Sequence, residues 1–292
     1  MGNFKTLDLE LALKFGFKFM NGQISCVNCH GEAIHHTEAV LKAPSMKHTK
    51  KNQEMKVYGR HAALKLAEKR PQDIIRAYTT REGVFEFKNI IRHCVDNKLA
   101  YHVVEKEELD SVSRATHHEG IVLVVKQKPI PTIKEMLTQP GRVLIVALEE
   151  VENPHNLGAI MRSCAHYGVN GIIYEAKVPV ALTGSAFRTA EGGAESVPAI
   201  HHSNWNEVFE LCKPLGYKCF ATSSHDGLSL FNTVFPEKSI LFLGAEGVGL
   251  SDKIIKKMNG LLQIPGTGEV ESLNVSNATA AILTEWFRQG LK

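Results

Sequence analysis

Residues 153–164 read NPHNLGAIMRSC, and they follow the apolar run VLIVAL at 143–148 after four residues. The apolar run predicts a buried strand, and the polar turn after it predicts the start of a helix. This helix has one apolar face at the spacing i, i+3, i+4, i+7, i+8, formed by Leu157, Ile160, Met161, Cys164 and Ala165. Arg162 lies on the flank of that face, where an arginine is usually a solvated cation. A function for Arg162 therefore depends on what the rest of the chain places beside it.

The same alternation of apolar strand and helix continues to the end of the chain. Strands are predicted at 143–148, 171–176, 217–223, 239–245 and 260–265, and helices at 157–168, 204–216, 251–258 and 274–289, with a helical or irregular stretch at 185–195. Continuous apolar strands that alternate with helices indicate a mainly parallel sheet covered on both faces. In such sheets ligands bind beyond the carboxyl ends of the strands.

A smaller α/β unit precedes this sheet. Helices are predicted at 59–70, 87–98 and 107–113, and strands at 74–80, 100–105 and 120–126. We therefore divide the chain into an N-terminal extension (1–54), a small α/β domain (55–128), a proline-bracketed linker (129–142) and an α/β domain (143–292).

Composition narrows the class of protein. The chain has 292 residues, 43% hydrophobic and 22% charged, with a net charge of +3. Nine lysines and arginines stand against five acids up to residue 60, which fits either a nucleic-acid partner or a solvated tail. Apolar runs fall short of the ~18 residues of a membrane span, and the first residues form no secretory signal. We expect a cytoplasmic protein without a membrane partner.

One pair of the six cysteines is closely spaced, in CVNCH at 26–30. Haem attachment at such a motif requires export, which the chain gives no sign of. Cys26 and Cys29 instead form half of a possible zinc site, which nearby histidines would complete, or they are free thiols. The irregular spacing of the histidines leaves both alternatives open, and we assign no metal.

Three polar loops that contain glycine follow predicted strands, at 149–162, 245–251 and 266–276. One such loop is explained by turn formation alone, but three suggest a common site at one end of the sheet. The glycines at 244, 247 and 249 are spaced GxxGxG instead of GxGxxG, and GxxxxGK[ST] is absent. The sequence therefore argues against a dinucleotide oxidoreductase and a P-loop NTPase.

These stretches resemble the three motifs of the SpoU (TrmH) family of RNA 2′-O-ribose methyltransferases. They are N-x-G-x-x-x-R at 156–162, LGAEGVGLS at 243–251 and IPGTGEVESLNVSNATAAI at 264–282. The resemblance covers essentially all of 143–292. Residues 55–128 are similar to the L30e-like RNA-binding domain of many members, and HHEGI at 117–121 fits its closing strand.

The resemblance implies a C-terminal trefoil knot, a homodimer formed through the C-terminal domain, S-adenosylmethionine as cofactor and RNA as partner. It favours rRNA slightly over tRNA. The positions that match cofactor-binding residues are Thr222, Ser223, Leu243, Gly244, Glu246, Gly249, Ile264, Pro265, Gly268, Leu273 and Asn274. Those that match catalytic residues are Arg162, Asn156, Glu246, Ser272 and Asn274. Asn277 departs from the family, where many members have a small apolar residue, and this affects helix packing.

Methyl transfer to a ribose hydroxyl requires positioning, deprotonation and exclusion of water. A guanidinium stays protonated in proteins, so Arg162 is unsuited to act as a general base. We expect it to bind the target phosphate and to stabilise negative charge on the 2′-oxygen, with Asn156 and Glu246 holding it in place. Ser272 and Asn274 would orient the ribose or the cofactor. The alternative is a non-catalytic RNA-binding or ribosome-assembly protein that retains the fold, and the intact motif residues argue against it.

Overall fold

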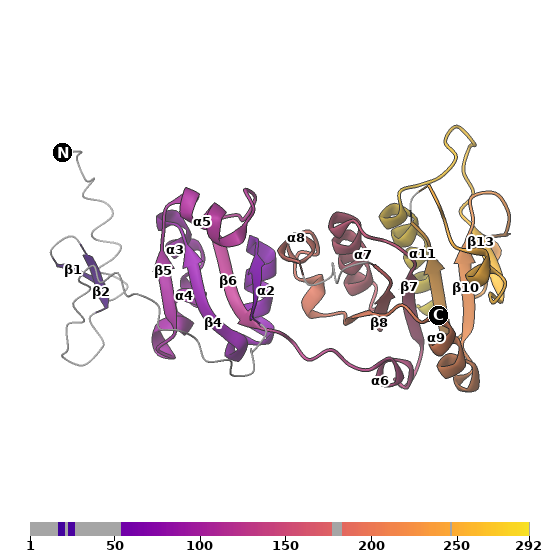
Figure 1. The fold of residues 1–292 in the computed structure, drawn as a ribbon, viewed down its shortest axis with the longest axis horizontal. Helices are drawn as coiled ribbons and strands as arrows, with labels where there is room; N and C mark the ends of the chain where they lie inside the picture. The colour runs from indigo at the N-terminus through magenta and orange to yellow at the C-terminus, as the bar shows by residue number, and fades with distance from the viewer. Residues whose placement is uncertain (1–16, 21–22, 27–53, 177–182, 246, 292) are drawn as a thin grey trace. The chain divides into compact units, whose positions relative to one another are not determined.

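The computed structural model describes residues 17–20, 23–26, 54–176, 183–245 and 247–291 (Figure 1). The chain divides into two compact units, residues 1–49 and 50–292. In the first unit, β1 (Phe17–Met20) pairs antiparallel with β2 (Gln23–Cys26). Cys29 and the histidines considered for a zinc site lie outside the described residues.

The second unit begins with a four-stranded sheet in the order β3-β6-β4-β5. Its strands are β3 (Glu54–Tyr58), β4 (Ile74–Thr79), β5 (Ala100–Val103) and β6 (Ile121–Lys126), and its helices are α2 (Arg60–Lys69), α3 (Arg81–Glu86), α4 (Lys88–Asp96) and α5 (Lys106–Ser113). β6 pairs antiparallel with both β3 and β4, whereas β4 and β5 are parallel. The predicted small α/β domain is therefore present, with β3 and α3 as elements that the sequence pattern did not indicate.

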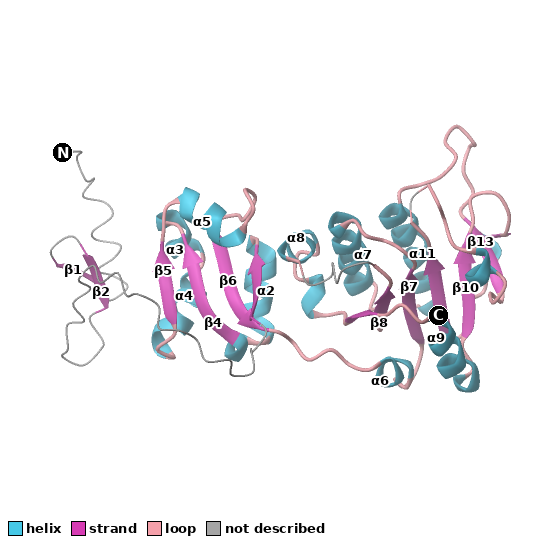
Figure 2. Cartoon of the chain, viewed as in Figure 1, coloured by secondary structure: helices cyan, strands magenta, loops and turns pink. Residues whose placement is uncertain are grey.

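A seven-stranded parallel sheet follows, in the order β11-β13-β10-β12-β7-β8-β9 (Figure 2). Its strands are β7 (Val143–Leu148), β8 (Gly171–Tyr174), β9 (Ala199–His201), β10 (Lys218–Thr222), β11 (Leu228–Ser229), β12 (Lys238–Leu243) and β13 (Gly260–Gln263). Its helices are α6 (Ile133–Leu137), α7 (Pro154–His166), α8 (Gly184–Thr189), α9 (Trp205–Cys212), α10 (Asp252–Ile255) and α11 (Val275–Gly290). The fold class, a mainly parallel α/β sheet preceded by a small α/β domain, is confirmed, and the trefoil knot stays a prediction.

The strand β7 shows why the sheet must be covered on both faces. All six of its residues are buried, and successive side chains point to opposite faces. Leu144 and Val146 pack in a cluster with residues of α7 and α11, whereas Ile145 packs with residues of α6 and α9. An uninterrupted apolar run is therefore what a central parallel strand requires.

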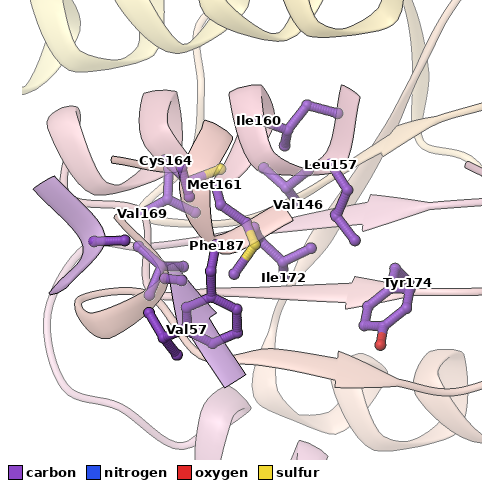
Figure 3. Packing of buried hydrophobic residues seen from close by; sticks show 14 of the residues in the cluster. Val57, Val146, Leu157, Ile160, Met161, Cys164, Val169, Ile172, Tyr174 and Phe187 are labelled. Carbon is purple, nitrogen blue, oxygen red and sulfur yellow. The ribbon is translucent and has the colours of Figure 1, made fainter. Parts of the chain in front are cut away.

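The helix α7 begins as its sequence predicts. The Asn153 side chain accepts a hydrogen bond from the His155 N–H at 2.9 Å, and Pro154 occupies a position at which a helix needs no N–H donor. Leu157, Met161 and the rest of the apolar face pack beside β7 and β8 (Figure 3). This arrangement leaves Arg162 exposed.

The segment predicted as a linker, 129–142, contains the helix α6. Thr132 and Glu135 form a capping box at its start, and Ile133, Met136 and Leu137 are buried against the sheet. This short amphipathic helix was not predicted because the prolines on either side of it indicated a linker. Among the described residues, no helix is long and apolar enough to cross a membrane.

Candidate active site

The carboxyl ends of four neighbouring strands form one edge of the seven-stranded sheet. The strands β13, β10, β12 and β7 are adjacent and parallel. Ser223 follows β10, Gly244 follows β12 and Ile264 follows β13 closely, while the turn before α7 follows β7. The three glycine loops predicted from the sequence therefore lie at the same edge.

Hydrogen bonds connect these loops. The Asn274 Nδ2 donates to the Asn156 Oδ1 at 3.1 Å, which joins positions 118 residues apart. The Ser251 backbone N–H and Oγ–H each donate to the Glu149 carboxylate at 2.7 Å. Side chains thus join the loop after β7 to the other two glycine loops, to the third through Asn156 and Asn274 and to the second through Glu149 and Ser251.

The first of the cofactor loops turns at Ser223. Thr222 ends β10, and the Ser223 N–H donates to the Leu262 carbonyl at 2.9 Å. The Ser223 Oγ accepts hydrogen bonds from the N–H groups of His225 and Asp226, at 3.3 and 3.1 Å. This serine shapes the loop itself, so its predicted contact with a cofactor would come in addition to a structural role.

The loop after β12 is so tight that it requires glycine at its first position. A Cβ at Gly244 would lie 2.1 Å from the carbonyl carbon of Gly249, and the Gly249 N–H donates to the Ala245 carbonyl at 2.9 Å. Such a loop presents backbone groups that a ligand can approach closely. Glu246, predicted to contribute to this site, lies outside the described residues.

Side chains around the third loop differ in exposure. Leu273 is 46% exposed, whereas Leu243 is only 1% exposed and belongs to the core. Pro265, Gly268 and Ser272 are exposed, and Ile264 is partly buried. Leu273 is therefore available to contact an apolar ring, but the side chain of Leu243 is not, because it packs between the sheet and its helices. The cofactor-binding role expected for Leu243 stays a prediction, and its backbone is the part that could make such a contact.

Arg162 is ion-paired with a residue that the sequence reasoning missed. Its Nη1 lies 2.8 Å from the Glu191 Oε1, and the two side chains are 58% and 40% exposed. Glu191 follows α8 and has a backbone φ of 45°. The expected partners were Asn156 and Glu246; Asn156 accepts a hydrogen bond from Asn274, and Glu246 lies outside the described residues. The only signal for Glu191 in the sequence is its place in the acidic, glycine-bearing stretch AEGGAE at 190–195.

The same stretch carries a second ion pair, to the small α/β domain. The Arg70 Nε and Nη2 donate to the Glu195 carboxylate at 2.7 and 3.0 Å, and both side chains are buried. Arg70 also donates to Asp73 at 3.2 Å and to the Lys126 carbonyl at 2.8 Å. Burial would lower the pKa of Arg70, but the carboxylates of Glu195 and Asp73 outweigh it and raise that pKa above its usual value. Arg70 therefore stays charged although it is buried.

Two family models match the two halves of this unit. Residues 143–284 match the model described as the SpoU rRNA Methylase family, and residues 56–131 match the one described as RNA 2′-O ribose methyltransferase substrate binding. The uncharacterized tRNA/rRNA methyltransferase YfiF of Escherichia coli O157:H7 is 39% identical over 247 residues, which cover 84% of this chain and 71% of that protein. The chain belongs to the SpoU rRNA methylase family. The predicted family and RNA methyltransferase activity are confirmed.

Other SpoU-family proteins show the same organisation. The 23S rRNA (guanosine-2′-O-)-methyltransferase RlmB of Photorhabdus laumondii is 30% identical over 80% of this chain and 97% of its own length. The AdoMet-bound rRNA methyltransferase of Sinorhizobium meliloti has a TM-score of 0.68 at 21% identity, covering 82% of this chain and 88% of its own. The SpoU methyltransferase AviRb of Streptomyces viridochromogenes, solved with AdoMet, has a TM-score of 0.67 at 23% identity, covering 82% and 91%. At these identities the two structures show that the fold is shared.

Proposed function

We propose that this SpoU-family chain transfers the methyl group of S-adenosylmethionine to a ribose 2′-hydroxyl of ribosomal RNA, in the cytoplasm. The observation that carries the proposal is the Asn156–Asn274 hydrogen bond of 3.1 Å. It joins the motif that contains Arg162 to the third glycine loop, so that an exposed cation and this loop lie at one edge of the sheet. The naming of RlmB as a 23S rRNA guanosine-2′-O-methyltransferase supports rRNA and the 2′-hydroxyl.

The residues at this edge suit the binding of an adenosine group. The backbone of the loop after Gly244 offers N–H and C=O groups, and the exposed side chain of Leu273 offers an apolar surface. When bound, S-adenosylmethionine supplies a methyl group on a sulfonium, which is already a strong electrophile. The protein therefore needs to orient the acceptor and to exclude water more than to activate the donor.

Arg162 is the residue that we assign to the acceptor. Its guanidinium remains charged and presents several N–H donors in a fixed plane, which matches a phosphate. We propose that it holds the target phosphate and stabilises the charge that develops on the 2′-oxygen. Ser272 and Asn274 orient the ribose or the cofactor, and the domain at 56–131 binds the flanking RNA.

We also propose a homodimer formed through the C-terminal domain. Four apolar side chains here are between 41% and 82% exposed. Phe287 lies on α11 and Leu291 directly follows it, whereas Phe231 lies in the turn Leu230–Asn232, which contacts α11, and Val234 lies two residues after that turn. Large apolar side chains gathered on one surface favour association with a second apolar surface. Sedimentation of the purified protein tests this, and a monomer at micromolar concentration would contradict it.

Methyl transfer from tritiated S-adenosylmethionine to rRNA tests the reaction, with nuclease digestion to identify the methylated nucleoside. Arg162→Ala should lower kcat by about 10²–10³-fold or more, as for the loss of a group that stabilises an oxyanion. Its affinity for the cofactor, measured by calorimetry, should change by no more than severalfold. The matched control is Arg92→Ala, which removes another exposed, ion-paired arginine; because this arginine lies in the domain proposed to bind flanking RNA, it should leave kcat at saturating rRNA unchanged.

The outcome that would contradict the assignment is normal turnover of Arg162→Ala at saturating cofactor. RNA binding by the wild-type protein without any methyl transfer would instead favour a non-catalytic RNA-binding protein. The two results are distinct, because the first removes only the role of Arg162.

A further inference from the structure

The stretch Ala190–Glu195, which we call the AEGGAE turn, contacts both Arg162 and the substrate-binding domain. We propose that Glu191 in this turn is a positioning residue, whose carboxylate holds the Arg162 guanidinium ready for the RNA phosphate. The inference rests on the role proposed for Arg162 and extends it to a residue outside the three SpoU motifs.

The ion pair itself restricts a side chain that would otherwise sample many rotamers. The Arg162 Nη1 lies 2.8 Å from the Glu191 Oε1, and both groups are accessible to water. Ordering a long arginine side chain costs conformational entropy. A carboxylate that is already in place reduces the part of that cost which falls on the transition state. Because the pair uses a single Nη1 contact, the remaining N–H groups of the guanidinium can meet a phosphate.

The backbone conformation of Glu191 is one that a residue with a side chain adopts at a cost in strain. Its φ of 45° lies in the left-handed region, which glycine adopts more readily than any other residue. The next two residues of the turn are glycines, yet the position that carries this conformation next to Arg162 is glutamate. Strain of this kind persists where the surrounding structure fixes it, and it is concentrated at functional sites.

On one side, the turn rests against the backbone of α7. A Cβ at Gly193 would lie 2.9 Å from the Met161 carbonyl oxygen and 3.0 Å from the Arg162 Cα. The turn therefore touches the residue whose side chain Glu191 holds. A glycine is required here by the close approach of two backbones.

On the other side, the turn is attached to the substrate-binding domain. The buried Arg70–Glu195 pair joins it to the end of α2, and the Lys128 Nζ donates to the Glu195 carbonyl at 2.9 Å. A Cβ at Gly192 would lie 2.6 Å from the Lys65 Cβ. The hydrophobic cluster continues across the same contact, where Val57 and Phe187 lie close together (Figure 3). Glu191 is thus fixed relative to both the arginine that it holds and the domain that binds RNA.

Two substitutions at this position distinguish the effect of the carboxylate from the effect of the backbone conformation. Glu191→Gln keeps the shape and removes the charge, whereas Glu191→Gly removes the side chain and suits the positive φ. Both should lower kcat by about tenfold or more, less than the 10²–10³-fold expected when an oxyanion-stabilising group itself is lost. The KM values for S-adenosylmethionine and for rRNA should stay within about twofold, because the residue acts on Arg162 and not on either substrate.

The matched control is Glu207→Gln, which removes another exposed carboxylate, 3.4 Å from the His202 Nε2, and should leave kcat unchanged. Thermal melting of each variant checks that the fold is intact. A kcat within twofold of wild type in both Glu191 variants would overturn the inference, and so would a raised KM for rRNA with an unchanged kcat.

The same assay separates this inference from the function on which it rests. If Arg162→Ala is inactive while Glu191→Gln and Glu191→Gly are fully active, the positioning role fails and the role of Arg162 stands. If Arg162→Ala is itself fully active, the proposed role of Arg162 fails, and the inference about Glu191 fails with it.

Discussion

The AEGGAE turn forms two arginine–glutamate ion pairs, one with α7 and one with the substrate-binding domain. The two pairs have the same chemistry but differ in burial and in the number of hydrogen bonds. Glu195 pairs with Arg70 through two hydrogen bonds, with 2% and 6% of the side chains exposed. Glu191 pairs with Arg162 through one short contact, with 40% and 58% exposed. One pair is sealed within the protein, and the other is open to water and to a substrate.

This difference in burial indicates that the Arg70–Glu195 pair stabilises the fold, whereas the Arg162–Glu191 pair is accessible to a substrate. Removing a buried pair from water is costly, and the cost is offset only when further hydrogen bonds satisfy both groups. Arg70 has these in Asp73 and the Lys126 carbonyl. An exposed pair contributes little to stability, but its cation can still reach a phosphate. The buried pair therefore fixes the turn, and the exposed pair uses the turn to place Arg162.

The largest effect is expected when the buried pair is broken. Arg70→Met should lower the free energy of unfolding by about 3–5 kcal/mol, because it leaves the Glu195 carboxylate buried without its partner. Urea denaturation followed by circular dichroism measures this. The double variant Arg70→Met/Glu195→Met should recover most of the loss, since it removes both charges. A single variant within about 1 kcal/mol of wild type would show that the pair is not a structural anchor.

A smaller effect is expected when the turn is pushed away from α7. Gly193→Ala places a methyl group against the Met161 carbonyl and the Arg162 Cα, and overpacking of this kind costs about 1–3 kcal/mol. It should also lower kcat, because it displaces Glu191 relative to Arg162. The control is Gly216→Ala, whose φ is 79° with nothing within 4 Å of the added Cβ. It should cost about 1–2 kcal/mol from backbone strain without changing kcat. Equal kcat values for the two variants would contradict the coupling.

The smallest effect on stability is expected at the exposed pair. Glu191→Gln should change the free energy of unfolding by less than about 1 kcal/mol, since water screens the interaction. Any difference from wild type should shrink further in 1 M salt, where the screening length is roughly 3 Å. A loss as large as that of Arg70→Met would mean that Glu191 is a structural residue, and that the contrast between the pairs is wrong.

The sequence was sufficient for those features that depend on local pattern. The strand VLIVAL and the helix that follows it were predicted from periodicity, and the loops around Asn156 and Asn274 from glycine and polar residues after strands. The hydrogen bond between these two side chains was not predictable from the strands, because their loops follow β7 and β13, which β12 and β10 separate in the sheet.

Features that depend on tertiary packing were not predictable in this way. Glu191 lies 29 residues from Arg162, and their contact exists only because the AEGGAE turn docks on α7. In the sequence, Arg70 is an ordinary charged residue at the end of a predicted helix, and its burial depends on the packing of the sheet and the turn around it. Likewise, the resemblance places Leu243 among the cofactor-binding positions but does not reveal that its side chain, at the end of β12, is buried in the core.

The most direct test of the account is a map of 2′-O-methyl groups in total RNA from cells with and without the gene. Deletion of the gene should remove a 2′-O-methyl group from ribosomal RNA. The wild-type gene should restore that group, and the gene that encodes Arg162→Ala should not. An unchanged map after deletion would contradict the proposed reaction.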